Sequence, residues 1–220
     1  MKKNLINLLL VTLVLASCKK NAPDAPKTAN NNPPAVENPQ GGGLGEIPNA
    51  GFENWLSKNG QEIPQGWYSI FYMLDTWWGI SKTTDKHSGN YAVLLETTKG
   101  IFSGTIMSGE TTYSLIPKFA CAYRPVSLDF YYKYIPSGED IAQINIELTK
   151  WNPTTKKSEY VGGTKLDIAA TSSYTQGSMP IKYDTQNMPD SASISLSSSK
   201  KVRHPPVGSK LYIDDLAFSK

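Results

Sequence analysis

Hydrophobic and polar residues alternate along much of the second half of the chain. Between residues 127 and 134 and again between 142 and 148, every second residue is apolar. A period of two predicts half-buried β-strands rather than helices, and Pro136-Ser137-Gly138 predicts a turn that joins the two strands. The apolar positions are Leu128, Phe130, Tyr132 and Tyr134, then Ala142, Ile144, Ile146 and Leu148.

Further short strands are expected at residues 91–96, 159–162, 192–196 and 211–216, and no stretch of ten residues carries a clear helical stripe. Short strands separated by Gly, Pro, Asn and Asp, without helical partners, are typical of packed antiparallel sheets. The sequence therefore predicts an all-β fold, an antiparallel β-sandwich of the jelly-roll type.

The first residues carry a targeting signal instead of a strand pattern. Lys2 and Lys3 precede an apolar run over residues 5–15, which ends in Leu-Ala-Ser-Cys at 15–18. A positive start, a short apolar core and small residues before a cysteine indicate a secretory signal peptide. The segment resembles the lipobox of bacterial lipoproteins, which implies cleavage before Cys18 and lipidation of that cysteine. A transmembrane anchor is the alternative, but roughly 11 apolar residues fall short of the ~20 that cross a bilayer.

Three regions follow from this composition. Residues 1–17 form the signal peptide, and residues 18–46 form the lipidated cysteine with a linker rich in Pro, Asn, Ala and Gly. A linker with so few large apolar residues cannot bury enough surface to fold, so we expect a disordered tether. Residues 47–220 form one folded domain by length.

Charge and cysteine content argue against a nucleic-acid-binding protein and against a disulfide-bonded domain. The formal net charge is +3, and removal of Lys2 and Lys3 leaves 20 basic against 19 acidic residues, which argues against nucleic acid as a partner. With Cys18 attached to lipid, Cys121 is the remaining thiol, so no intramolecular disulfide is expected. Its apolar neighbours predict a buried, inert thiol rather than a nucleophile.

Several short motifs occur in a recognisable order. They are Asn-Ala-Gly-Phe-Glu at 49–53, Pro-Gln-Gly-Trp at 64–67, His-Ser-Gly-Asn-Tyr-Ala at 87–92 and Tyr-Ile-Asp-Asp-Leu at 212–216. This order resembles the galactose-binding-like jelly rolls of carbohydrate-binding modules. With residues 124–134, it is also similar to the domain assigned to carbohydrate metabolism in Bacteroidetes lipoproteins. The resemblance implies a jelly roll that binds glycans.

The same resemblance implies a structural calcium ion. Its ligands would be Glu53 and Asp214, with Asp215 as the alternative aspartate, completed by backbone carbonyls near residues 87–89. Hard oxygen ligands suit calcium, and such a clip would join the two ends of a domain without disulfides. The alternative is that these carboxylates are solvated. His87 and His204 are expected to be solvated loop residues, because they are far apart in sequence and neither has a Cys or a second His nearby to suggest a zinc site.

Aromatic residues beside Gly, Pro or Asn are the candidate sugar-binding residues. Sugar rings pack on aromatic faces, while polar side chains bind their hydroxyl groups. Any single Trp has the alternative of a core position, which is what we expect for Trp55 and Trp67. The candidates are Trp77, Trp78, Trp151, Tyr72 and Asp75.

These observations predict non-catalytic glycan binding by a lipoprotein anchored at the outer membrane or the periplasmic face of the cell envelope. A structural or adhesive lipoprotein that binds a protein partner of a surface complex is the alternative. A glycan-active enzyme is third, because it requires two carboxylates at a defined separation and the sequence gives no pair that stands out from its 19 acids.

Overall fold

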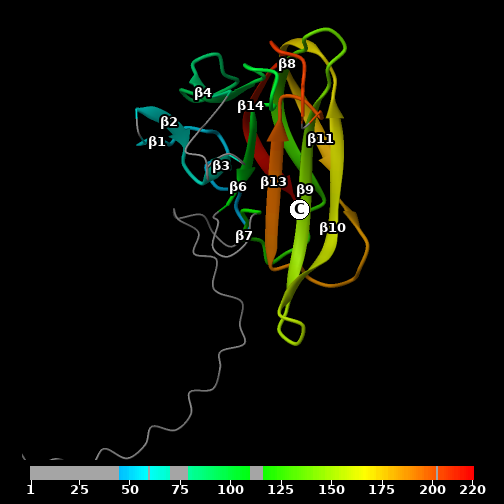
Figure 1. The fold of residues 1–220 in the computed structure, drawn as a ribbon. Helices are drawn as coiled ribbons and strands as arrows, with labels where there is room; N and C mark the ends of the chain where they lie inside the picture. Colours follow the sequence, from blue (N-terminus) through cyan, green and yellow to red (C-terminus); the bar gives the residue numbers. More distant parts are fainter. Residues whose placement is uncertain (1–44, 59, 70–78, 110–115, 202) are drawn as a thin grey trace, which may run out of the picture. The chain divides into compact units, whose positions relative to one another are not determined.

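The computed structural model describes residues 45–58, 60–69, 79–109, 116–201 and 203–220. These residues form strands and connecting loops (Figure 1). No helix in this part of the chain is long and apolar enough to span a membrane.

Every strand pairing is antiparallel, and the strands form two large sheets and one small sheet. In the seven-stranded sheet the order is β12 (Lys182–Tyr183), β10 (Lys157–Ile168), β9 (Ala142–Asn152), β13 (Ser191–Ser197), β6 (Thr105–Ser108) and β3 (Trp67–Ser69), with β7 (Phe119–Ala120) also paired to β13. In the five-stranded sheet the order is β11 (Thr171–Pro180), β8 (Ser127–Ile135), β14 (Lys210–Ser219), β5 (Ala92–Glu96) and β4 (Ile80–Thr83). The small sheet pairs β1 (Trp55–Lys58) with β2 (Gln61–Pro64).

The core consists of alternate side chains from both large sheets, which confirms the predicted β-sandwich. From β9, Ala142, Ile144, Ile146 and Leu148 are buried to 1% exposure or less, and β8, β13 and β14 contribute in the same way. Period-two burial follows from strand geometry, because successive side chains point to opposite faces. Cys121 is fully buried in this core, and burial raises the pKa of its thiol to about 11.

The turn after β8 and the strand β11 differ from what the sequence pattern predicted. The turn at Pro136-Ser137-Gly138 joins β8 to β9, but these strands lie in different sheets, so the turn crosses from one layer to the other. The ten-residue strand β11 was not predicted from the sequence. It lies at the edge of its sheet and buries few side chains, so its Ser- and Thr-rich sequence carries no apolar alternation.

The Asn-Ala-Gly-Phe-Glu motif forms a tight loop that seals one side of the core. Asn49 and Phe52 adopt positive φ angles of 45° and 52°. This places the fully buried ring of Phe52 against Trp67, with 5.1 Å between ring centroids. Trp67 donates a hydrogen bond from its ring nitrogen to the carbonyl of Pro48 at 2.8 Å. Trp67 is therefore a packing residue, as predicted, and Trp55 packs against the same core.

We expect Trp67→Phe to lower the free energy of unfolding by about 2 kcal/mol, because it leaves the Pro48 carbonyl without its donor and a small void beside Phe52. Urea unfolding of the full chain measures this change. Trp151→Phe is the matched control, since Trp151 lies at a partly exposed strand end and the substitution should cost less than ~0.5 kcal/mol. Equal losses in the two variants would contradict a specific role for the Trp67 hydrogen bond.

Candidate functional site

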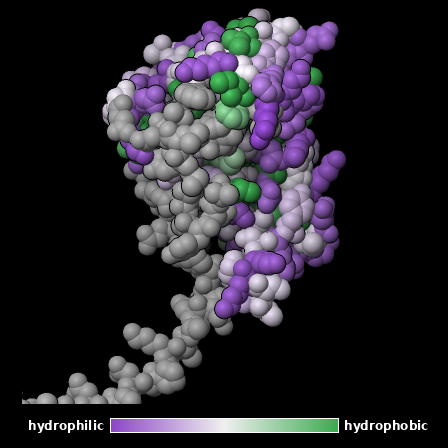
Figure 2. Space-filling model, viewed as in Figure 1, coloured by the Kyte–Doolittle hydropathy of each residue, from purple (hydrophilic) through white to green (hydrophobic). Residues whose placement is uncertain are grey.

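The outward face of the seven-stranded sheet is polar along its central strands. We call this surface the polar sheet face. Since side chains alternate along a strand, the residues opposite the core share this face by register. Figure 2 shows mostly hydrophilic and neutral colours on the flank where Figure 1 places β10. The outward positions are Asn145, Glu147, Thr149 and Trp151 from β9, Ser191, Ser193 and Ser195 from β13, Tyr160, Gly163 and Lys165 from β10, and Lys118. Among them, Thr149 and Ser193 are buried, at 3% and 5% exposure.

A hollow of about 310 Å³ lies on this face between β9 and β10. The pairing of the two strands shifts by one residue between Tyr160 and Gly162, so Val161 is the extra residue and turns into the core. Because of this bulge, Tyr160 and Gly163 both face outward, opposite Thr149 and Glu147. The hollow is lined by Asn145, Ile146, Glu147, Tyr160, Gly163, Thr164 and Lys165.

Gly163 forms the floor of the hollow. A Cβ atom there would lie 3.1 Å from the Tyr160 hydroxyl oxygen and would collide with the Ile146 carbonyl. Glycine therefore allows the tyrosine side chain to lie along its own strand beside Glu147 and Asn145. The result is an aromatic wall that is 47% exposed, next to an amide, a carboxylate and an ammonium group from Lys165.

Burial shifts the pKa values of two groups on this face, the Tyr160 hydroxyl and the Lys118 ammonium group. Burial raises the pKa of the Tyr160 hydroxyl, and the nearby carboxylates of Asp184 and Glu147 raise it further, so this group remains a neutral hydrogen-bond donor. Lys118 donates a hydrogen bond to the Thr149 hydroxyl at 3.0 Å. Burial lowers the pKa of Lys118, while Glu147 and Asp190 act in the opposite direction.

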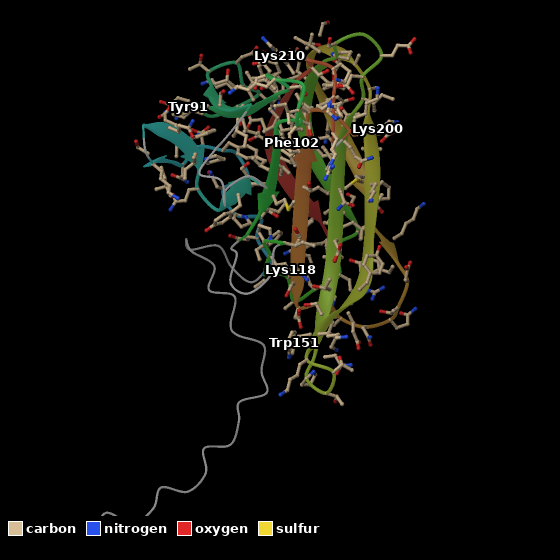
Figure 3. The ribbon with its side chains drawn as sticks, viewed as in Figure 1. Tyr91, Phe102, Lys118, Trp151, Lys200 and Lys210 are labelled. Carbon is tan, nitrogen blue, oxygen red and sulfur yellow. The ribbon has the colours of Figure 1, made fainter. Side chains whose placement is uncertain are left out.

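Among the aromatic residues predicted to bind sugar, Trp151 lies at the end of β9 and on the polar sheet face. Its backbone N–H donates to Oδ2 of Asp190 at 2.7 Å, and Asp190 also accepts a bond from the Ser191 hydroxyl at 2.7 Å. Figure 3 labels Trp151 near the lower end of the strand and Lys118 above it. The other predicted residues, Tyr72, Asp75, Trp77, Trp78 and the lipidation site Cys18, lie outside the described residues.

Sequence reasoning missed the hollow itself. No sequence motif singles out Tyr160, Gly163, Lys118 or Glu147 as a candidate binding residue. The pair Gly162-Gly163 was the available signal, because glycine inside a strand often marks a bulge or a close approach. The pattern could not show that the bulge turns Tyr160 outward.

The three carboxylates predicted as calcium ligands come together around the loop at residues 87–91. Oδ2 of the fully buried Asp214 accepts N–H bonds from His87 at 2.9 Å and from Ser88 at 3.1 Å. Oε1 of Glu53 accepts N–H bonds from Asn90 at 2.7 Å and from Tyr91 at 3.2 Å. We call this arrangement the terminal clip, because it holds residues from both ends of the domain on one loop.

An irregular position in β14 allows two successive aspartates to reach the same loop. Neighbours in a regular strand point to opposite faces, but Asp215 has a φ of 49° and the pairing with β8 shifts between Asp214 and Ala217. Asp215 therefore accepts a bond from the Ser88 hydroxyl at 2.9 Å and lies 2.7 Å from Nδ1 of His87. Next to this position, the N–H of Leu216 donates to the carbonyl of Ala50 at 3.0 Å, which ties the first motif to the last strand.

His87 and His204 are exposed loop residues, as predicted, but His87 also makes specific contacts. Its ring stacks on Tyr131 at 3.4 Å between centroids with an interplanar angle of 8°. Together with the contact to Asp215, this stacking fixes the loop over the outward face of the five-stranded sheet. The physical reason was not visible in sequence, since Tyr131 and Asp215 are both distant from residue 87 along the chain.

The carboxylates of the terminal clip act as hydrogen-bond acceptors in this arrangement. Burial raises the pKa of Asp214, and the N–H groups of Ser88 and His87 oppose that rise. Desolvation would raise the pKa of Glu53, but the N–H groups of Asn90 and Tyr91 outweigh it, so the pKa is lowered. N–H groups are directed at Oε1 of Glu53 and at Oδ2 of Asp214, so these oxygens accept hydrogen bonds in this arrangement. The described residues contain no group of three or more His, Cys, Asp or Glu side chains placed to hold a metal ion, so the calcium ion stays a prediction.

The chain matches no protein-family model and no curated protein. It is similar in structure to two proteins provisionally assigned as glycoside hydrolases. One is from Bacteroides thetaiotaomicron, with 16% identity, a TM-score of 0.58 and coverage of 78% of this chain and 71% of that one. The other is from Bacteroides vulgatus, with 20% identity, a TM-score of 0.58 and coverage of 77% and 96%. A carbohydrate-binding module of family 61, solved with β-1,4-galactotriose, covers 78% of this chain and 95% of its own at 10% identity and a TM-score of 0.40.

The first two similarities show that the antiparallel β-sandwich is shared with other proteins. At these identities they extend to the fold alone, and function has to be argued from the site.

We expect Gly89→Ala to lower the free energy of unfolding by more than ~2 kcal/mol, because its Cβ would collide with Oε1 of Glu53 and its φ of +58° disfavours alanine. Gly138→Ala is the matched control. Gly138 has a φ of +60° with no atom within 4 Å of the added Cβ, so this variant carries the backbone cost without the collision. Denaturant unfolding compares the two, and equal destabilisation would show that the Glu53 contact contributes nothing.

The effect of Ca²⁺ on the melting temperature tests whether the terminal clip carboxylates bind a metal ion. If they serve only as acceptors, the melting temperature of the full chain is the same in Ca²⁺, in Mg²⁺ and with a chelator. Occupied calcium sites would instead stabilise the fold by about 2.7 kcal/mol at a hundredfold excess over Kd. A calcium-specific rise that Glu53→Gln removes would establish the metal-bound form implied by the resemblance.

Proposed function

We propose that this protein binds a glycan on the polar sheet face and does not act on it chemically. The observation that carries the proposal is the hollow beside Tyr160, Gly163 and Glu147, with Asn145 and Lys165 at its margin.

The residues of the hollow match the chemistry of a sugar ring. A pyranose has a C–H face that packs on an aromatic ring, and its hydroxyl groups both donate and accept hydrogen bonds. Tyr160 offers the exposed aromatic surface. Glu147 accepts hydrogen bonds, Lys165 donates them, and the Asn145 amide does both. The mixture of one carboxylate and one ammonium group favours an uncharged ligand over a strongly anionic one.

Binding without catalysis is supported by the carboxylates present. A glycosidase needs two carboxyl groups across the scissile bond at a defined separation. Among the described residues that line the hollow, Glu147 is the only carboxylate. A glycan-active enzyme therefore ranks below a binding protein.

We also propose that lipid on Cys18 anchors the protein to the outer membrane or to the periplasmic face of the cell envelope. Two lysines, a short apolar run and the sequence Leu-Ala-Ser-Cys support this placement. The Pro- and Gly-rich linker after Cys18, with about 28 residues, would hold the binding domain on the order of 30 Å from the membrane.

One observation favours a protein partner as the second candidate. Ile101 and Val207 are 47% and 55% exposed, and their loops meet, since a Cβ on Gly100 would lie 3.1 Å from Cγ2 of Val207. Exposed aliphatic groups that gather in one place are typical of interaction surfaces.

The test is a glycan array probed with the full-length chain purified in detergent, followed by calorimetry on the sugars that bind. We expect saturable binding, and we expect Tyr160→Ala to weaken it about tenfold, equivalent to ~1.4 kcal/mol. Tyr160→Phe should retain most of the affinity, because the ring face is kept and only the hydroxyl is lost.

The matched control is Tyr91→Ala, which removes a tyrosine from the loop that precedes β5. Figure 3 labels Tyr91 far from Trp151, and Lys82 lies over its ring. This variant should bind like the parent chain. A silent array with a folded protein would overturn the proposal and leave the protein-partner candidate, whereas sugar cleavage during the assay would identify an enzyme.

A further inference from the structure

Two loops at one end of the β-sandwich combine positive charge with exposed aliphatic groups. The loops are residues 97–104 and 198–209, and they are joined by a hydrogen bond from the N–H of His204 to the carbonyl of Ile101 at 3.3 Å. We call the exposed charged and aliphatic residues of these loops the cationic end. They are Lys99, Ile101, Lys200, Lys201, Arg203 and Val207.

The positive charge is concentrated at this end. Neither loop contains Asp or Glu, although the chain after the signal peptide has nearly equal numbers of basic and acidic residues. Two carboxylates beside the loops are already bonded, since Asp140 is buried and bound to serine hydroxyls and Asp167 pairs with Lys200 at 2.9 Å. Lys201 and Arg203 form no ion pair with another described residue. Their charges are therefore available to an anionic partner.

Aliphatic groups lie among these charges. Ile101 and Val207 are 47% and 55% exposed, and a Cβ on Gly100 would lie 3.1 Å from Cγ2 of Val207. Ile135, which is 46% exposed, lies at the end of β8 and pairs with Lys210 at the start of β14. Cations beside exposed aliphatic groups match a bilayer with anionic headgroups, because the cations attract the phosphates and the aliphatic groups enter the headgroup boundary.

The point where the linker enters the domain allows this surface to reach the anchoring membrane. The Tyr123 hydroxyl donates to the carbonyl of Gly45 at 3.2 Å, and its ring contacts Phe218 near the end of β14. Lys210, at the start of this strand and labelled near the top of Figure 3, is roughly 27 Å from Phe218 at the rise of an extended strand. The linker of about 28 residues spans on the order of 30 Å. A tether that matches the span between two contacts gives the second contact its highest effective concentration.

We infer that the cationic end docks on the anionic headgroups of the same bilayer that holds the lipid on Cys18. This inference rests on the proposed lipid anchor and is independent of glycan binding in the hollow. Docking gives the domain a second attachment to the membrane at the end far from the linker. The domain then keeps one orientation on the bilayer instead of rotating freely on its tether.

The experiment places a fluorescent probe on the full-length lipidated chain in vesicles that contain brominated quencher lipids. The probe is attached at Thr98→Cys, an exposed position that keeps Ile101 and Val207 intact, or at Thr154→Cys in the turn between β9 and β10 as a control. The buried thiol of Cys121 should not react. We expect strong quenching at residue 98 in vesicles of phosphatidylglycerol and phosphatidylethanolamine, weak quenching in phosphatidylcholine, and little quenching at residue 154 in either.

Charge variants of the Thr98→Cys chain test the role of the cations. Lys201→Gln with Arg203→Gln should lower the ratio of docked to free domain about 25-fold, because each cation near an anionic surface contributes about a factor of five. Glu139→Gln should raise this ratio, since it removes an exposed carboxylate from the turn that precedes Asp140. The matched control is Lys150→Gln with Lys157→Gln, which removes two exposed charges from β9 and β10 and should leave the quenching unchanged.

Equal quenching at residue 98 in anionic and neutral vesicles would overturn the inference, as would quenching that the Lys201 and Arg203 substitutions leave unchanged. A probe that stays in water on both vesicles would also overturn it and would leave a protein partner as the candidate for this surface. If the lipidated chain does not float with the vesicles, the proposed anchor fails and the inference fails with it. Glycan binding is measured separately on the array and does not depend on these outcomes.

Discussion

The arrangement of the loops depends on the hydrogen bonds that the buried carboxylate of Asp214 accepts. A buried charge is costly unless hydrogen bonds satisfy it, and Asp214 meets this requirement with N–H groups from His87, Ser88 and Asp215. The loop at residues 87–91 is therefore held on the five-stranded sheet, and Glu53 holds its other end. In the described chain the only cysteine is buried and free, so this polar clip joins the two ends where other domains use a covalent link.

The clip also makes the two outward faces of the sandwich different. Over the five-stranded sheet, His87 stacks on Tyr131 and removes part of that surface from water. On the seven-stranded sheet, Tyr160 and Lys165 remain exposed beside the hollow. One face is thus used to complete the fold, while the other presents aromatic and hydrogen-bonding groups to solvent.

The hollow arises from two departures from regular strand structure that occur together. A bulge at Val161 turns Tyr160 outward, and Gly163 leaves room for its ring. Either feature costs stability on its own, since a bulge interrupts the ladder and glycine contributes no side chain to packing. Departures of this kind are expected where a protein uses a surface for binding. The shared β-sandwich fold does not by itself indicate a binding surface, because one fold serves many functions.

The sequence by itself determined the strands whose inner side chains are apolar, the burial of Cys121 and Trp67, and the grouping of Glu53, Asp214 and Asp215 suggested by the resemblance. Period-two patterns and apolar neighbours indicate the strands and the burial of Cys121, because both depend on residues nearby in the chain. The burial of Trp67 and the grouping of the three carboxylates came from the resemblance. The sequence did not reveal β11, whose edge position leaves Met179 as its one buried side chain, nor that the turn after β8 changes sheets. Only the tertiary structure decided that His87 packs on Tyr131 and that Tyr160 faces outward beside Glu147. These outcomes depend on how the strands are paired and on the one-residue shift between β9 and β10. The pattern of hydrophobic residues along the chain predicts neither.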